Sequence, residues 1–476
     1  MIFSRFFPAL LLCIAAAVPT LAQAATTGGA APRMPWGMPF AGMLLSIALL
    51  PLCMPAIWHR HHGKIAAAWA LAFLLPFAAT HGMAAAGTLL VHALLAEYLP
   101  FLMLLSTLYV VAGGICLNLR PGSTAARNTA MLALGAALAS VMGTTGAAML
   151  LVRPLLRANA GRRDARHVMV FLIFVVANVG GALTPLGDPP LFLGFLNGVG
   201  FFWTARHLSM PMLSLCIALL AVFYAIDRRM WRREAPLLER PVEAGAPDAP
   251  RLDGVLNVGL LLLVVAVVLL SGVWRTPPAF TLAGTPLRVS DLLRDATLLL
   301  VLVLSLWLTP ASARRGNAFE WGPIVEVAKL FAGIFVTIAP VLAMLAAGSE
   351  GPFAALISGL SDADGRPDPA RYFWLAGGMS AFLDNAPTYL VFFHMAGGDA
   401  AQLMGEGAST LAAISAGAVF MGALTYIGNA PNFMVKAIAE ARGVRMPSFF
   451  GYMVWSGAIL VPLLAAVSYL FFSASA

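Results

Sequence analysis

Long apolar stretches separated by short polar ones recur along the whole chain. A helix needs about 20 mostly apolar residues to cross the hydrocarbon core of a bilayer. Ten stretches reach or approach this length and predict membrane-spanning helices. In chain order they are 38–57, 65–80, 98–117, 167–197 and 208–226, then 254–274, 292–308, 323–347, 409–438 and 448–472. The pattern therefore predicts an all-α polytopic membrane protein.

Two further apolar blocks, 128–160 and 372–396, differ from spanning helices because small or polar residues lie at their centres. The centre of the membrane is where polar residues are most costly in a spanning helix. Each block lies between the third and fourth members of a series of five spanning segments. We therefore predict that each block is a re-entrant hairpin with a polar tip.

The distribution of charge predicts how these segments are oriented, because cytoplasmic loops are enriched in Lys and Arg. With the mature N-terminus outside, the basic loops fall inside and the acidic loops outside. The inside set is Arg60, Lys64, Arg120, Arg127, Arg153, Arg157, Arg162, Arg163, Arg166, Arg228, Arg229, Arg232, Arg233, Arg314, Arg315, Lys436, Arg442 and Arg445. The outside set is Glu97, Glu350, Asp362, Asp364, Asp368, Asp399 and Glu406. This holds only if the first hairpin enters from the cytoplasm and the second from outside.

The predicted organisation is two inverted repeats, each with five spanning segments, one re-entrant hairpin and one broken helix. The first repeat covers 38–226, with its hairpin at 128–160 and its broken helix at 167–197. A Pro- and Glu-rich cytoplasmic linker is expected at 227–253. The second repeat covers 254–473, with its hairpin at 372–396 and its broken helix at 409–438.

Residues 1–24 have the pattern of a secretory signal peptide. Arg5 precedes an apolar run that ends near Val18, and Ala22-Gln23-Ala24 is a small-x-small cleavage pattern. The alternative is an uncleaved first transmembrane helix. Either interpretation places the residues that follow outside the cytoplasm and predicts a multi-pass protein of the bacterial inner membrane.

An internal repeat is visible in the letters. Residues 181–190 read GALTPLGDPP and residues 422–431 read GALTYIGNAP, at a constant offset of 241 that also relates Thr144 to Asn385. Gly, Pro and Asp at membrane depth interrupt a helix and free backbone polar groups, which are tolerated where they line a protected cavity. Paired interruptions in two inverted halves indicate the central site of a transporter. The alternative is a proline-kinked structural helix.

The interruptions and the hairpin tips together offer carboxylates, amides, hydroxyls and open carbonyls, which are the oxygen ligands that hard cations such as sodium prefer. Asp188 and Asp384 are the leading candidates for a sodium ligand, because an acid at membrane depth is costly and is retained for function. A buried carboxylate can hold a proton or a cation in turn. The alternatives are an Asx turn for Asp188 and a helix N-cap for Asp384.

Composition supports these predictions and excludes several classes of protein. The chain is 60% hydrophobic and 11% charged, against roughly 25% charged in soluble domains. Its net charge of +8 follows the topology, so it does not indicate nucleic-acid binding. The four cysteines form no CxxC pair. Because we find no nucleophile–base pair and no nucleotide-binding motif, we expect neither an enzyme nor a resident cofactor, and transport would use an ion gradient.

Three stretches carry a family resemblance: NVGGALTPLGDPP, AFLDNAPT and ALTYIGNAPN, which begin at residues 178, 381 and 423. They resemble the signature stretches of the ion transporter superfamily, most of all the NhaD-type sodium/proton antiporters and the related citrate-carrier (CitMHS-like) group. Arsenite permeases are more distant. The resemblance implies a homodimer with a scaffold domain and a mobile transport domain that gives elevator-like alternating access. The positions it assigns to the ion site are Thr144, Thr145, Asn178, Thr184, Asp188, Asp384, Asn385, Thr388, Thr425 and Asn429.

We therefore expect a secondary active transporter, first a sodium/proton antiporter in which cation and proton compete for a membrane-embedded Asp. The alternative is a citrate, dicarboxylate or arsenite carrier on the same fold. Dicarboxylate carriers of the superfamily have Ser-Asn-Thr at the hairpin tips, whereas this chain has Gly-Thr-Thr and Asp-Asn-Ala. The expected partners are membrane lipid, a small inorganic cation or small anion, and a second copy of the chain, with neither nucleic acid nor nucleotide.

Overall fold

The chain is an all-α polytopic membrane protein, as predicted. The computed structural model describes residues 33–118, 124–234, 251–274, 276–362 and 365–473, so the predicted signal peptide and most of the predicted linker lie outside the described residues. Within the described ranges, eight helices are long and apolar enough to cross a membrane. They cover 34–53, 55–81, 83–113, 125–142, 203–234, 256–273, 322–346 and 449–471.

The first half of the chain contains α2 to α10. Its elements are η1 (Met34–Gly37), α2 (Met38–Cys53), α3 (Pro55–His81), α4 (Met83–His92), the π-helix η2 (Ala93–Tyr98), α5 (Leu99–Gly113), β1 (Cys116–Asn118), α6 (Ala125–Met142), α7 (Thr144–Ala158), α8 (Arg166–Phe171), the π-helix η3 (Leu172–Val176), η4 (Val179–Gly181), α9 (Pro189–Leu196) and α10 (Trp203–Glu234).

The second half contains α11 to α22. Its elements are β2 (Arg251–Asp253), α11 (Leu256–Val273), β3 (Pro278–Leu282), β4 (Thr285–Arg288), α12 (Val289–Leu308), α13 (Ala311–Gly316), α14 (Gly322–Ala346), η6 (Gly348–Glu350), α15 (Ala354–Gly359), α16 (Pro369–Ser380), α17 (Asn385–Met395), α18 (Ala400–Met404), α19 (Ala408–Met421), η7 (Gly422–Leu424), α20 (Ala430–Ala441), α21 (Phe449–Trp455), the π-helix η8 (Ser456–Leu460) and α22 (Val461–Phe471).

The described strands form two small antiparallel pairs, β1 with β2 and β3 with β4. The first pair joins the end of α5 to the start of the second half, because Cys116 lies opposite Asp253 and Asn118 opposite Arg251. The second pair is the connection between α11 and α12. The first pair touches the helical core, because Cys116 is buried and Leu117 packs against the core side chains.

Two helices begin earlier than the hydropathy pattern predicted. The stretch 58–64, expected as a loop, belongs to α3, which starts at Pro55. A proline is favourable in the first turn of a helix, and Trp58 is 3% exposed, so this polar turn is anchored by a buried side chain. Likewise, the third apolar helix starts at Met83 and continues without a break through η2 into α5. The reasons differ: a polar turn extends α3 beyond its apolar stretch, whereas the residues added at the start of the third helix, 83–92, are mostly apolar themselves.

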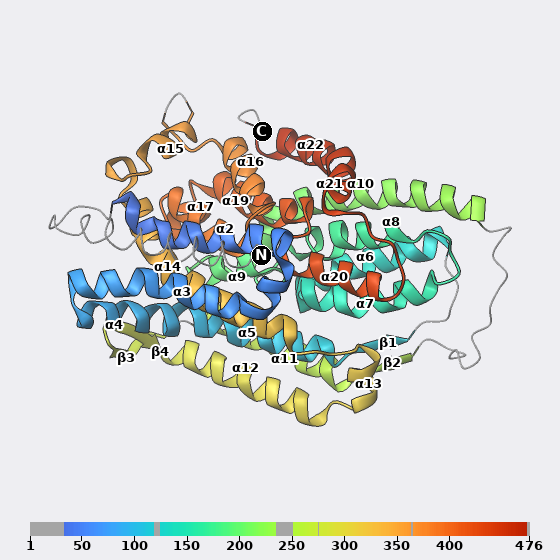
Figure 1. The fold of residues 1–476 in the computed structure, drawn as a ribbon, viewed down its shortest axis with the longest axis horizontal. Helices are drawn as coiled ribbons and strands as arrows, with labels where there is room; N and C mark the ends of the chain where they lie inside the picture. Colours follow the sequence, from blue (N-terminus) through green and yellow to red (C-terminus); the bar gives the residue numbers. More distant parts are fainter. Residues whose placement is uncertain (1–32, 119–123, 235–250, 275, 363–364, 474–476) are drawn as a thin grey trace, which may run out of the picture.

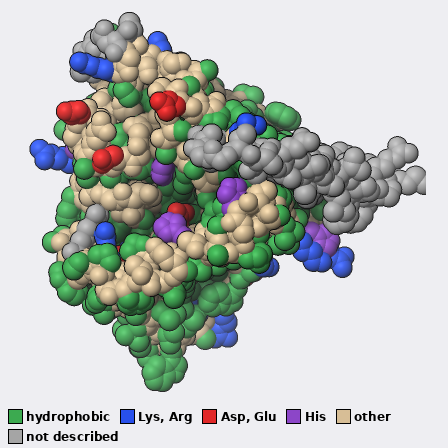
Figure 2. All heavy atoms as spheres, turned by 90° about the vertical axis from the view of Figure 1, so that its left-hand side faces the viewer, with side chains coloured by type: hydrophobic (Ala, Val, Ile, Leu, Met, Phe, Trp, Pro, Cys, Tyr) green, Lys and Arg blue, Asp and Glu red, His purple; other side chains and the backbone are tan. Residues whose placement is uncertain are grey.

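The helices form two groups in Figure 1, where α3, α4, α5, α11 and α12 lie along one side and α6 to α8, α16, α19 and α22 along the other. Within the first group α3 packs against α14 and α5 against α12; within the second α6 packs against α7 and α16 against α19. The pair α6–α7 lies at the end of the molecule where α10 finishes, whereas α16 and α17 lie toward the opposite end (Figure 1). Seen from that opposite end, the molecule is hollowed near its middle, and histidine side chains lie around the hollow, whereas most acidic side chains in view lie above it (Figure 2).

Candidate functional site

Two interrupted helices supply the polar centre of the molecule. The first interruption separates η3 from α9, and the second separates α19 from α20. Asp188 is the N-cap residue of α9 and Asn429 is that of α20, and each is followed within two residues by a proline, which is favourable in a first helical turn. Neither side chain caps its own helix. Both are therefore available for contacts across the site.

Asp188 is the carboxylate on which the site converges. Its Oδ1 accepts hydrogen bonds from Thr144 Oγ1 at 2.8 Å and Asn429 Nδ2 at 3.2 Å, and its Oδ2 accepts one from Asn385 Nδ2 at 2.5 Å. Asp188 is 1% exposed. Removing a carboxylate from water is costly unless hydrogen bonds replace the lost hydration, and these three donors do so. The donors come from the tip between α6 and α7, the tip between α16 and α17, and the second interruption.

The contacts at this centre follow the internal repeat. Asp188 and Asn429 are 241 positions apart, and so are Thr144 and Asn385. Each of these four residues therefore has its repeat-related counterpart at the same polar centre. The repeat is not chemically symmetric here, because one half contributes the carboxylate and the other an amide.

Two threonines hold the tips against the interruptions in a matching way. Thr184 Oγ1 donates to the carbonyl oxygen of Ser140, and Thr425 Oγ1 donates to that of Ala381. Both donors and both acceptors are related by the offset of 241. We conclude that Thr184 and Thr425, assigned above to the ion site, use their hydroxyls to fasten the helix before each tip.

Glycines allow each interrupted segment to fold back on itself. A Cβ built on Gly187 would lie 2.0 Å from the carbonyl oxygen of Gly181, and one on Gly428 would lie 2.6 Å from that of Gly422. These are backbone contacts that a side chain cannot push aside. The two glycine pairs are also 241 positions apart. The GALT-x-x-G spacing is therefore a steric requirement of the crossing, in addition to a repeated motif.

Asn432 is a site residue that the sequence analysis missed. Its Nδ2 donates to the carbonyl oxygens of Gly422 and Thr425 at 2.8 and 2.9 Å, and its Oδ1 accepts from Asn178 Nδ2 at 2.7 Å. Asn178 in turn accepts from Asn429 Nδ2 at 3.2 Å. Asn432 thus satisfies carbonyls freed by the second interruption and orients the amide beside Asp188. The final Asn of ALTYIGNAPN, a polar residue inside a half-helix, was the available signal.

Asp384 has a different position from Asp188. It is the N-cap residue of α17, with its Oδ1 accepting from the backbone N–H of Ala386 at 3.0 Å, and it is only partly buried. Thr388 Oγ1 donates to the carbonyl oxygen of Asp384 at 2.9 Å, which reinforces the same turn. Within the described residues, the carboxylate of Asp384 therefore caps α17 and forms no hydrogen bond with the side chains that surround Asp188.

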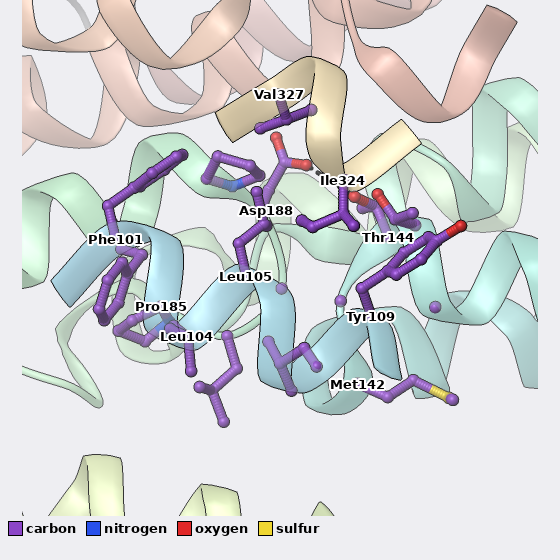
Figure 3. A pocket seen from close by; sticks show the side chains of 18 of the residues that line it. Phe101, Leu104, Leu105, Tyr109, Met142, Thr144, Pro185, Asp188, Ile324 and Val327 are labelled. Carbon is purple, nitrogen blue, oxygen red and sulfur yellow. Dashed lines mark hydrogen bonds between the residues drawn. The ribbon is translucent and has the colours of Figure 1, made fainter. Parts of the chain in front are cut away.

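A pocket lies beside Asp188, between α5, the first turns of α14 and the tip of α6–α7. Its empty volume is about 610 Å³, including its open mouth. Asp188, Thr144 and Thr145 line it together with Tyr109, and the remaining lining side chains are apolar or proline. Figure 3 shows Asp188 and Thr144 between the α5 side chains and Ile324 and Val327 of α14. No Lys, Arg or His is among the described residues that line this pocket.

A second buried polar cluster lies away from the pocket. Arg162 pairs with Asp227, and its Nε also contacts Glu234 Oε2 at 3.1 Å, while His167 Nε2 lies 2.8 Å from Asp227 Oδ1. Asn128 Nδ2 donates to Asp227 Oδ2 at 2.8 Å. Arg162 was interpreted above as a topology signal alone. The structure gives it a further role, since it ties the end of the α6–α7 pair to α10.

The chain is similar to known families of membrane transporters. Residues 29–472 match a family described as "Putative citrate transport". The chain belongs to this family. It is also 25% identical over 348 residues to proteins of Mycobacterium tuberculosis and Mycobacterium bovis, each named an uncharacterized transporter. Each alignment covers 71% of this chain and 74% of the relative.

Membership in this family makes the chain a transporter of the superfamily that its three motifs resemble. The match covers both interruptions and both tips, so the converging residues lie inside the part of the chain that matches the family. The description names citrate for the family as a whole, and the relatives' names specify no solute. Which solute this member carries is therefore argued from the site itself.

Proposed function

We propose that this protein is a sodium/proton antiporter in which Asp188 binds either a proton or the cation. One observation carries the proposal: a single, almost fully buried carboxylate lies where both tips and the second interruption meet, in a pocket lined by no described basic residue. A carboxylate in such a place is rarely retained unless it has a function. A negative centre without a cationic partner favours a positively charged solute.

The donors around Asp188 support exchange between two ligands. Thr144, Asn385 and Asn429 stabilise the ionised carboxylate, and their own oxygens are additional ligands for a hard cation. Burial opposes the ionised form when no cation is present, because the charge is removed from water. A proton therefore binds when sodium leaves. Competition at one carboxylate couples the two fluxes.

Alternating access in this proposal follows from the two halves. The pocket lies along α5 from Phe101 to Tyr109 and beside the first turns of α14, and the predicted topology assigns this start of α14 to the cytoplasmic side. We propose that this state faces the cytoplasm and that the group holding the two tips moves as a body relative to α5 and α14. A homodimer in the bacterial inner membrane is part of the same proposal.

The test uses inside-out membrane vesicles from an antiporter-deficient host. Respiration acidifies the interior, and sodium, lithium or potassium is then added while the interior pH is followed by fluorescence. We expect rapid alkalinisation on addition of sodium to the wild type and none with Asp188→Asn. Glu406→Gln is the matched control, since it removes an exposed carboxylate that does not line the pocket. No response of the wild type to any cation would refute the proposal.

The second candidate is citrate transport, and the family description favours it. For this function a bound cation would have to neutralise Asp188 before a tricarboxylate could enter the pocket. The N-terminal turns of α9 and α20 would then be the groups facing the anion, because helix N-termini attract negative charge. Labelled citrate uptake into the same vesicles, with and without sodium, tests this candidate directly. Sodium-dependent uptake without sodium-driven alkalinisation would favour it over antiport.

A further inference from the structure

The pocket beside Asp188 has walls that a bare metal ion does not require. Phe101, Leu104 and Leu105 of α5 face it from one side, and Ile324 and Val327 of α14 from another. Most of the side chains that line it are apolar, as they are in sites for organic ligands. The apolar side chains can contact the hydrocarbon part of a ligand. The Asp188 carboxylate can bind one positively charged group of the same ligand.

The hydrogen bonds at Asp188 limit how a ligand can reach it. An ionised carboxylate offers about four acceptor positions. Three are filled by Thr144, Asn385 and Asn429. One N–H donor can occupy the remaining position without disturbing these three, whereas sixfold coordination of a metal ion requires the donors to turn their oxygens inward. The resting arrangement is therefore already suited to an ammonium group.

We propose that this pocket binds an amphiphilic monocation, a primary ammonium on a short aliphatic or aryl body, with its N–H donating to Asp188. The inference rests on the proposed function, because it requires an ionised Asp188 that exchanges its proton for a cation. It adds the substrate class: organic monocations compete with sodium at the same carboxylate. Phe101 and Phe192, both in the lining, offer aromatic faces for the charged end or the body of such a ligand.

Binding is measured on purified protein in detergent, by thermal shift and calorimetry, without a proton gradient. This choice matters because neutral amines cross lipid and would collapse a gradient on their own. The probes are methylammonium to butylammonium. We expect affinity to rise about fourfold per added methylene, the value for burying a CH₂ group. Sodium should weaken the binding competitively, and Asp188→Asn should abolish it.

Matched probes and variants separate three contributions to binding: the positive charge of the ligand, its N–H donor and its hydrocarbon part. Alkanoates of the same chain lengths carry the opposite charge and should not bind. Trimethylbutylammonium keeps the charge but has no N–H, and should bind about tenfold more weakly than butylammonium, the cost of losing a hydrogen bond to a charged group. Leu105→Asn should flatten the dependence on chain length. Leu99→Asn, on an exposed part of the same helix, should not.

The outcomes distinguish this inference from the proposed function. Sodium/proton exchange with no alkylammonium binding, or binding that ignores chain length, overturns the inference and leaves antiport standing. Alkanoate binding without ammonium binding overturns both and favours the anion carrier. If Asp188→Asn still binds alkylammonium as the wild type does, the ammonium group does not bind at Asp188 and the inference is wrong. Should the Asp188 variant fail to fold, competition between sodium and butylammonium on the wild type decides, since non-competitive behaviour excludes a shared site.

Discussion

The double variant Asp188→Asn/Asn429→Asp exchanges the carboxylate and the amide between two repeat-related positions. It tests most directly whether transport depends on which half of the repeat supplies the carboxylate. The two side chains are in contact, with Asn429 Nδ2 3.2 Å from Asp188 Oδ1, and the exchange preserves one carboxylate and one amide. Thr144 and Asn385, the other two donors, remain in place. The double variant therefore moves the carboxylate to the other half of the repeat without changing the composition of the site.

The single variants define the magnitudes. Asn429→Asp alone places two carboxylates at about the present 3.2 Å separation, where two unit charges repel by roughly 5 kcal/mol at an effective dielectric constant of 20. Both cannot be charged at once, so one retains a proton and exchange slows. Asp188→Asn alone removes the exchanging group. We expect it to reduce sodium-driven proton movement at least about 100-fold, a loss of roughly 3 kcal/mol of coupling.

The assay is the initial rate of alkalinisation in inside-out vesicles at matched protein levels, with thermal stability measured in detergent. We expect the double variant to recover to within about tenfold of the wild type, an energy of roughly 1.4 kcal/mol. The stability lost in Asn429→Asp should also return in the double variant. A double variant that is as stable as the wild type but no more active than Asp188→Asn would refute the idea that either half can supply the carboxylate.

The remaining predictions concern stability and the role of Asp384. Gly187→Ala should abolish folding, because its Cβ would lie 2.0 Å from a backbone oxygen, whereas Gly378→Ala, with open space around it, should leave the yield of monodisperse protein unchanged. Asp227→Asn should cost about 3 kcal/mol, because buried Arg162 would keep only its second carboxylate partner, Glu234. The thermal midpoint should fall far more than with the exposed Arg228→Gln. Asp384→Ala should lose about 1 kcal/mol of helix capping, whereas Asp384→Asn keeps the cap, so a transport defect in the Asn variant would identify a role for its charge.

Local physical chemistry explains why the interruptions could be located from the sequence. Proline lacks a backbone N–H and glycine lacks a Cβ, so GALTPLGDPP and GALTYIGNAP interrupt a helix in almost any surroundings. The offset of 241 then indicated which positions correspond. It related Thr144 to Asn385 and Asp188 to Asn429, and these four residues are the ones in contact at the centre.

Other features could not be predicted because they depend on distant segments. Asp188 and Asp384 have equivalent surroundings in the sequence, each beside a helix start and a nearby proline. Only the crossing of the two halves places Asp188 against Asn385, which is 197 positions away, while Asp384 remains a cap. The pairing of Arg162 with Asp227 and of Asn178 with Asn432 also joins segments with no local relation.

The sequence by itself thus determined an all-α membrane protein, the places where its helices are interrupted and the polar atoms available there. These properties follow from the length of the apolar stretches that the bilayer requires and from the backbone chemistry of Gly and Pro. Both act within a short stretch of the chain. The tertiary structure decided which carboxylate is enclosed, which donors surround it and how apolar the pocket beside it is. Those properties arise from packing between segments that lie from 44 to 241 positions apart in the chain, since burial and hydrogen bonding belong to the assembled core.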